Sequence, residues 1–160
     1  MYARPLKAAL GALALTAGVS AHALCVLCTG SVSATPHAFG TYSPLSNTAK
    51  DSASSVTVTI SGTAGLLVSY EIALGTGQAG SVATRAMTNG VTSMRYNLFS
   101  DAARSVLWGV APSATVVDSF LLNVLGTSTR SHDVYGRIPA GQLALQPGTY
   151  TDTVTVTVVF

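Results

Sequence analysis

The residues of this 160-residue chain that could take part in catalysis, redox chemistry or metal binding include two cysteines, three histidines and six acidic residues. Cys25 and Cys28 form a C-x-x-C pair. In thioredoxin-like enzymes such a pair opens a helix, whose N-terminal dipole stabilises a thiolate. Here Thr29-Gly30-Ser31 follows, with no helix signal and no flanking βαβ pattern. We therefore favour a structural role, either a local disulfide between Cys25 and Cys28 or bonds from these cysteines to other partners, including another chain.

The remaining titratable residues are too few and too scattered for a convincing active site. His132, Asp133 and a serine could form a hydrolase triad, but the chain has no G-x-S-x-G elbow, and neighbours in a strand point to opposite faces. We expect a surface histidine beside a solvated aspartate. Zinc would need three or four ligands, and the cysteine pair, His37 and His132 lack finger-like spacing. The sequence predicts no catalytic residue, no metal and no cofactor.

The first 23 residues have the organisation of a secretory leader. Arg4 and Lys7 form a positive region, residues 8–19 are apolar, and Ala21-His22-Ala23 is an A-x-A cleavage site. Twelve apolar residues span about 18 Å as a helix, short of a hydrocarbon core of about 30 Å. We predict a signal peptide over residues 1–23 and a single exported domain over residues 24–160, with no membrane span after cleavage.

Charge is scarce in the rest of the chain. Charged residues make up 9% and hydrophobic residues 48% of the sequence, against a usual charged fraction of about 25%. Without Arg4 and Lys7, six basic and six acidic residues remain. A neutral, apolar-rich chain excludes disorder and offers no electrostatic attraction to nucleic acid. It favours a surface built for contact with other proteins.

Apolar and polar residues alternate with a period of two, which is typical of half-buried strands. The clearest cases are residues 55–60 and the C-terminus, where Val154, Val156, Val158 and Phe160 share one face. Shorter strands are predicted at residues 66–74, 94–99, 116–125 and 134–138, a long surface loop at residues 43–55, and at most a turn of helix at residues 101–104. Many short strands bounded by Gly and Pro predict an all-β antiparallel sandwich.

Several segments match a known family in order. They are Cys28, Val32-Ser33-Ala34-Thr35, Phe39-Gly40-Thr41-Tyr42, Val56-Thr57-Val58-Thr59, Tyr70, Arg85-Ala86-Met87-Thr88-Asn89-Gly90, Tyr96-Asn97-Leu98-Phe99-Ser100-Asp101-Ala102-Ala103-Arg104, Trp108-Gly109, Val134-Tyr135-Gly136-Arg137-Ile138-Pro139-Ala140-Gly141-Gln142 and Gly148-Thr149-Tyr150-Thr151-Asp152-Thr153-Val154-Thr155-Val156. In this order the segments resemble the spore coat U domain family of secreted bacterial proteins, related to subunits of archaic chaperone-usher pili.

The resemblance implies an immunoglobulin-like sandwich that lacks its last strand and accepts a donor strand from another polypeptide. The expected partners are a periplasmic chaperone, an outer-membrane usher and neighbouring pilus or coat subunits. The groove edge would be Val154, Val156, Val158 and Phe160, and the chain stops at Phe160 while still alternating. Family members usually carry a second cysteine at the end of the strand that here reads Val58-Thr59-Ile60-Ser61, and this chain has none there.

Aromatic and basic residues are expected to serve packing. Trp108, Tyr96 and Tyr135 are predicted to pack in the core or between the sheets rather than to form a sugar-binding platform. For the arginines, Arg85, Arg104 and Arg137, we expect buried or loop-bracing pairs with Asp101 and Asp152.

The predicted function is that of an exported, non-enzymatic structural or adhesive subunit, which passes through the periplasm to the cell surface or is secreted. The alternative is a stand-alone secreted or periplasmic module that binds a carbohydrate or matrix ligand through its end loops. A secreted hydrolase is a third possibility, and it would depend on His132.

Overall fold

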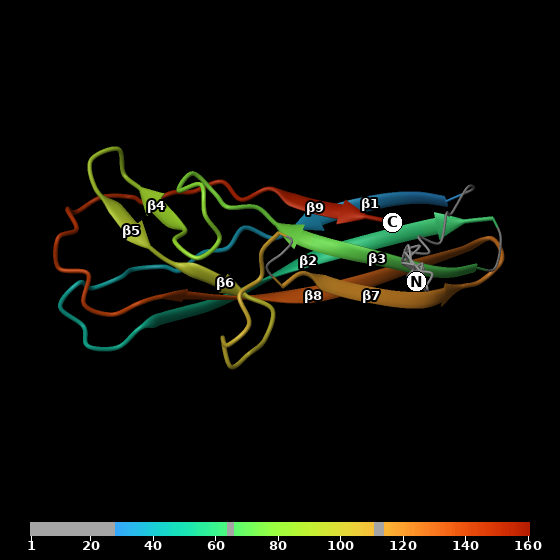
Figure 1. The fold of residues 1–160 in the computed structure, drawn as a ribbon, viewed down its shortest axis with the longest axis horizontal. Coiled ribbons are helices and arrows are strands. Elements are labelled where there is room, and N and C mark those ends of the chain that lie inside the picture. Colours follow the sequence, from blue (N-terminus) through green and yellow to red (C-terminus); the bar gives the residue numbers. More distant parts are fainter. Residues whose placement is uncertain (1–27, 64–65, 111–113) are drawn as a thin grey trace, which may run out of the picture.

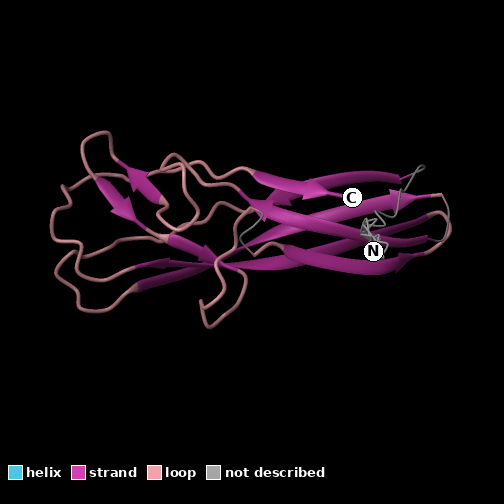
Figure 2. Cartoon of the chain, in the orientation of Figure 1, coloured by secondary structure: helices cyan, strands magenta, loops and turns pink. Residues whose placement is uncertain are grey.

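The computed structural model describes residues 28–63, 66–110 and 114–160. These residues form strands, turns and loops without a helix, as Figure 2 shows. The strands are β1 (Cys28–Ala34), β2 (Lys50–Gly62), β3 (Leu66–Leu74), β4 (Ala86–Thr88), β5 (Ser93–Arg95), β6 (Asn97–Phe99), β7 (Val116–Leu122), β8 (Gly126–Ile138) and β9 (Val156–Val159).

Two antiparallel sheets face each other in an elongated sandwich (Figure 1). One sheet has the order β1-β2-β8-β6 and the other the order β7-β3-β9, while β4 and β5 form a separate small hairpin at one end. Every pairing within these sheets is antiparallel. The sheets put their apolar faces together, so the predicted all-β, immunoglobulin-like sandwich is confirmed.

The longest strands, β2 and β8, pair with each other over their whole length, from Lys50 opposite Ile138 to Gly62 opposite Gly126. The predicted loop over residues 43–55 is therefore wrong at its C-terminal end, because residues 50–55 belong to β2. Likewise, β8 begins at Gly126 rather than at residue 134. Both extensions are rich in Ser and Thr, whose modest strand preference is decided here by backbone pairing with a neighbour.

The core follows the predicted alternation. Val56, Val58 and Ile60 of β2 are buried, as are Val68, Tyr70, Ile72 and Leu74 of β3. Trp108 and Tyr96 are buried as expected, and Trp108 Nε1 donates to the Ile72 carbonyl at 2.9 Å. Tyr135, in contrast, is not in the core. It lies on the outer face of β8, where the Arg104 guanidinium lies 5.7 Å from its ring centroid.

The arginines do not take the predicted acidic partners. Arg137 pairs with Asp51 at 2.7 Å across the β2–β8 ladder, and Arg104 reaches the same carboxylate at 3.4 Å. Asp101 instead holds the turn of its own loop, where it accepts from the backbone nitrogens of Ser105 and Val106. That loop is a turn rather than a helical segment, since Arg104 adopts a φ of 58°.

Candidate functional site

One long side of the sandwich is formed by two strand edges with no strand between them among the described residues. In the described part of the chain, β1 pairs only with β2 at the end of its sheet, and β9 pairs only with β3 at the end of the other. Figure 1 shows β1 and β9 next to each other, near the marked C-terminus. We call this opening between β1 and β9 the first seam. Each edge presents unpaired backbone groups, as any sheet edge does.

The C-terminal segment that borders this seam alternates as the sequence predicts. Val154, Val156 and Val158 are half-buried and pack against the core, whereas Thr153, Thr155 and Thr157 are exposed. Regular pairing with β3 covers only Val156–Val159, and ahead of it the Gly75 nitrogen donates to the Thr155 carbonyl at 2.8 Å.

Phe160 closes one end of the first seam. Its ring lies over Gly30 of β1, where an added Cβ would come within 2.6 Å of the ring. The ring centroid is also 6.2 Å from that of Tyr70. The two strand edges are thus bridged by a side chain instead of by backbone, and the glycine in β1 provides the space for it.

Beyond Phe160 the seam widens into a groove along the body of the molecule. A cavity of about 450 Å³ lies between residues 34–37 and residues 150–156, and its floor includes Val56, Leu74 and Leu98. A second cavity of about 740 Å³ continues toward the end loops, and the two share His37, Phe39, Met87 and Tyr150. The groove lining is mainly apolar, so an extended segment with alternating apolar residues fits its chemistry.

His37 is a polar residue in this groove, considered from the sequence only as a zinc ligand. Its two ring nitrogens share hydrogen bonds with the hydroxyls of Ser54 at 2.7 Å and Ser52 at 2.6 Å, and its ring packs 4.8 Å from that of Phe39. Burial lowers the pKa of His37, because the apolar surroundings disfavour the charged imidazolium.

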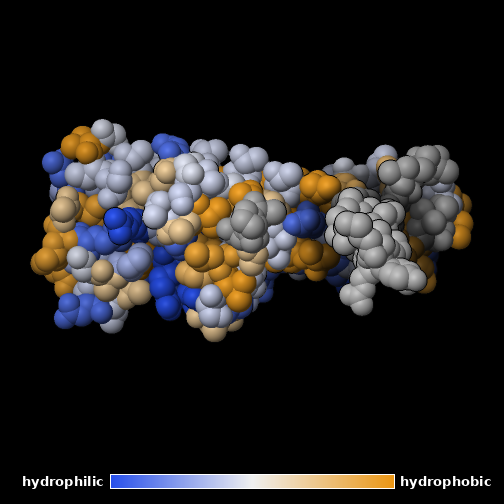
Figure 3. All heavy atoms as spheres, viewed as in Figure 1, coloured by the Kyte–Doolittle hydropathy of each residue, from blue (hydrophilic) through white to orange (hydrophobic). Residues whose placement is uncertain are grey.

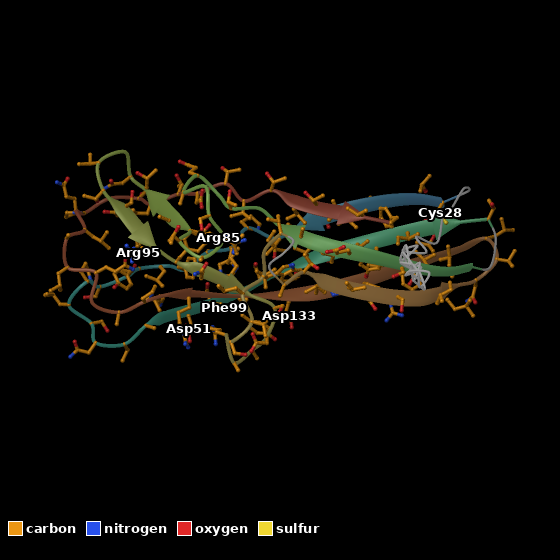
Figure 4. All side chains as sticks on the ribbon, in the orientation of Figure 1. Cys28, Asp51, Arg85, Arg95, Phe99 and Asp133 are labelled. Carbon is orange, nitrogen blue, oxygen red and sulfur yellow. The ribbon has the colours of Figure 1, made fainter. Side chains whose placement is uncertain are left out.

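A buried arginine holds the floor of the groove at the end of β3. Arg85 is fully buried and donates to the carbonyls of Leu74, Gly75 and Trp108 at 2.7–2.9 Å. Nearby, Tyr96 donates to Asp152 at 2.7 Å, and burial together with this bond raises the pKa of the phenol. Figure 4 places Arg85 inside the fold between the hairpin and the main sheets. Only the tertiary structure reveals that this arginine donates hydrogen bonds to backbone carbonyl oxygens.

The opposite long side carries a different set of groups. The Tyr70 hydroxyl donates to Asp118 Oδ2 at 3.0 Å and shares a hydrogen bond of 2.8 Å with His132 Nε2. Arg130 sits over the Phe120 ring at 5.2 Å. His132 is therefore not the predicted surface histidine but a mostly buried one between the sheets. Asp133, on the other face of β8, bonds to Tyr135.

These contacts do not build a catalytic triad. His132 and Asp133 point to opposite faces of β8, and the partners of His132 are a tyrosine and Asp118 rather than a serine. Within the described ranges, no group of three or more His, Cys, Asp or Glu residues could hold a metal ion.

Cys28 is disulfide-bonded and lies opposite Gly62 in the β1–β2 ladder, at the pole labelled in Figure 4. Cys25 lies outside the described residues, so the predicted pairing of Cys25 with Cys28 stays a prediction. The leader, residues 1–23, also lies outside them.

The loops at the opposite pole expose aliphatic side chains. Leu45, Val91 and Leu143 are each at least 70% exposed, and hydrogen bonds such as that from Tyr42 to the Pro139 carbonyl tie their loops together. Figure 3 shows apolar surface at this end.

The fold and the open seam define an immunoglobulin-like sandwich with unpaired strand edges. The chain belongs to the Spore Coat Protein U domain family, whose model matches residues 12–157. No curated protein matches it at a significant level.

Among solved structures, it shares its fold with a chain of the CsuC–CsuE chaperone–tip adhesion subunit pre-assembly complex from archaic chaperone-usher Csu pili of Acinetobacter baumannii. The TM-score is 0.52 and the sequence identity 22%, over 84% of this chain and 40% of that one. This chain therefore spans well under half the length of that relative. In the described part of the chain, no helix has the length and hydropathy needed to cross a bilayer.

Proposed function

We propose that the protein is an exported, non-enzymatic structural or adhesive subunit of a cell-surface pilus or coat, completed by a strand from another polypeptide. Family membership and the sandwich fold support this reading. The observation that carries it is the apolar groove that continues the first seam between residues 34–37 and 150–156. A sandwich that leaves this groove to solvent lacks a partner for its apolar floor.

The proposed mechanism is strand addition. An extended segment would enter the first seam, pair its backbone with the free edge of β9, and place alternate apolar side chains into the groove. Val154, Val156, Val158 and Phe160 would border it. A periplasmic chaperone would supply this strand during export, and a neighbouring subunit would replace it during assembly at an outer-membrane usher.

The test is coexpression of the full-length chain with its cognate periplasmic chaperone, followed by copurification from the periplasm. We expect a stoichiometric complex, together with a large drop in yield when the chaperone is omitted. In the complex, amides of β9 should exchange with solvent at least tenfold more slowly than in the free chain. Equal yield with and without the chaperone, with no copurification, would reject the proposal.

The exposed aliphatic loops favour a second candidate, a binding module that contacts a matrix through its end loops. Substituting Leu45, Val91 and Leu143 by serine should then abolish binding to that matrix and leave chaperone capture unchanged. The same triple variant with unaltered matrix binding would eliminate this candidate.

A further inference from the structure

The sandwich has a second open side, formed by β7 and β8. In the described part of the chain, β7 is the end strand of its sheet and pairs only with β3. Across from it, among the described strands, β8 pairs with β6 only at residues 135–137, so its stretch over residues 126–134 has a free edge as well. The two strands meet at a tight turn, where the Gly126 nitrogen donates to the Asn123 carbonyl at 3.0 Å. We call this opening the second seam.

The composition of β7 favours pairing with another strand. Five of its seven residues are apolar, it contains no proline and no lysine, and Val117 and Leu121 are about two-thirds exposed on its outer face. Exposed apolar edges of this kind are ordinarily sites of strand addition and aggregation. We therefore expect side chains along the β7 edge that disfavour the addition of another strand.

Polar and charged side chains occupy the inward-facing positions along the second seam. Asp118 of β7, with its side chain 28% exposed, faces His132 of β8 at 3.7 Å, and the hydroxyl of buried Tyr70 bonds to both. One position further along the inner face of β8, Arg130 covers the Phe120 ring. Each of these polar groups has a partner or solvent contact while the seam stays open.

Closing the second seam with a strand would remove that solvent. Each apolar side chain of an incoming strand contributes about 1.5–3 kcal/mol when it is fully buried. Enclosing the Asp118 carboxylate or the Arg130 guanidinium without a new partner costs several kcal/mol for each charge. The cost exceeds the gain unless the entering strand brings matching charges at the same positions.

We propose that Asp118, held by Tyr70 and His132, and Arg130, stacked over Phe120, prevent strand addition along the β7 edge. The strand that they exclude is that of a second copy of this chain pairing along β7. This role does not depend on which partner fills the first seam, because it concerns the opposite side of the sandwich.

The test compares two variants of the purified full-length chain that lose the same charge and gain the same apolar side chain. Asp118→Leu places leucine inside the second seam, and Asp133→Leu places it on the outer face of the adjacent strand β8. We expect Asp118→Leu to form dimers or larger assemblies at concentrations at least tenfold lower than the parent chain. The β7 amides on the free edge, which do not pair with β3, should exchange with solvent at least tenfold more slowly in those assemblies.

The control Asp133→Leu should associate no more than the parent chain and leave β7 exchange unchanged. Arg130→Leu, at an exposed position, provides a second variant in case Asp118→Leu does not fold, and it should shift association in the same direction. Equal association of the Asp118 and Asp133 variants would overturn the proposal. A folded Asp118→Leu or Arg130→Leu variant with unchanged β7 exchange would do so as well. Failure of chaperone capture would count only against the proposed function, because this readout involves no chaperone.

Discussion

The two long sides of the sandwich present the same backbone chemistry and opposite side-chain chemistry. Both seams lie between the edges of the two sheets. The first is bordered by Gly30, Val156, Val158 and Phe160, and it widens into a mainly apolar groove. The second is filled by Tyr70, Asp118, Arg130 and His132.

Unpaired N–H and C=O groups are available on both sides, so the backbone alone cannot decide where a strand is added. In our proposal side-chain polarity decides it, because covering apolar groups is favourable and covering charged groups is unfavourable unless they find partners. Two opposite sides of one small domain can in this way have different roles. The following changes test that contrast, from the largest expected effect to the smallest.

The largest effect is expected from a charge in the first seam. Val156→Asp or Val158→Asp would place a carboxylate against the apolar groove without a partner, at a cost of several kcal/mol. We expect chaperone capture to be lost and periplasmic yield to fall, as measured by copurification. Hydrogen exchange of β2 and β8 reports whether the rest of the sandwich stays intact.

Thr155→Asp is the matched control, since Thr155 lies on the exposed face of the same segment. This variant should be captured almost as well as the parent chain. Equal losses of chaperone capture for the substitutions at residues 155, 156 and 158 would contradict the assignment of inward and outward faces. They would also contradict the proposed difference between the two seams.

Removing the buried cation near the first seam should have the next largest effect. Arg85→Leu leaves the carbonyls of Leu74, Gly75 and Trp108 without their donors, which we expect to lower the free energy of unfolding by about 3–5 kcal/mol. Chemical denaturation measures this change in the free energy of unfolding. Arg137→Leu breaks an exposed pair with Asp51, which solvent screens, so its loss of unfolding free energy should be much smaller than that of Arg85→Leu. Similar losses of unfolding free energy in both variants would show that burial does not determine how much each arginine contributes to stability.

A smaller effect is expected where Phe160 crosses the first seam. Gly30→Ala would push a methyl group into the ring, at a cost of about 1–2 kcal/mol. In a Phe160→Ala background the same change should cost little, so a double-mutant cycle of unfolding free energies measures the contact directly. Additive effects would mean that the ring does not bridge the seam in solution.

The smallest predicted effect is a pH dependence from His37. The folded chain has a His37 pKa below the ordinary value, so the unfolded chain binds the proton more tightly. Stability from this group is therefore fully present above about pH 6.5 and is lost as the pH falls through the window between that value and the lowered pKa. Thermal melts across this range should show the loss, and His37→Gln should remove it. A parent chain with flat melting temperatures between pH 7 and pH 5 would contradict the assignment.

Local sequence patterns sufficed for the parts of the fold in which burial repeats every second residue. The strand over Leu66–Leu74 was predicted at both ends, and the faces of the C-terminal segment follow directly from Val154, Val156 and Val158 alternating with threonine. Family membership could also be predicted, because it depends on many short motifs in a fixed order. The roles of the groove edge and of the Cys25–Cys28 pair remain predictions.

The tertiary structure alone decided the features that depend on residues far apart in the chain. Residues 50–55 are polar and turn-like by themselves, and they form a strand because β8 pairs with them. Arg85 is buried because three carbonyls from two separate segments converge on it. His132 contacts Tyr70 and Asp118 only because β3, β7 and β8 lie close together in the folded chain. Alternation along a strand is a local property that sequence displays, whereas the partner of a buried charge is set by packing between strands.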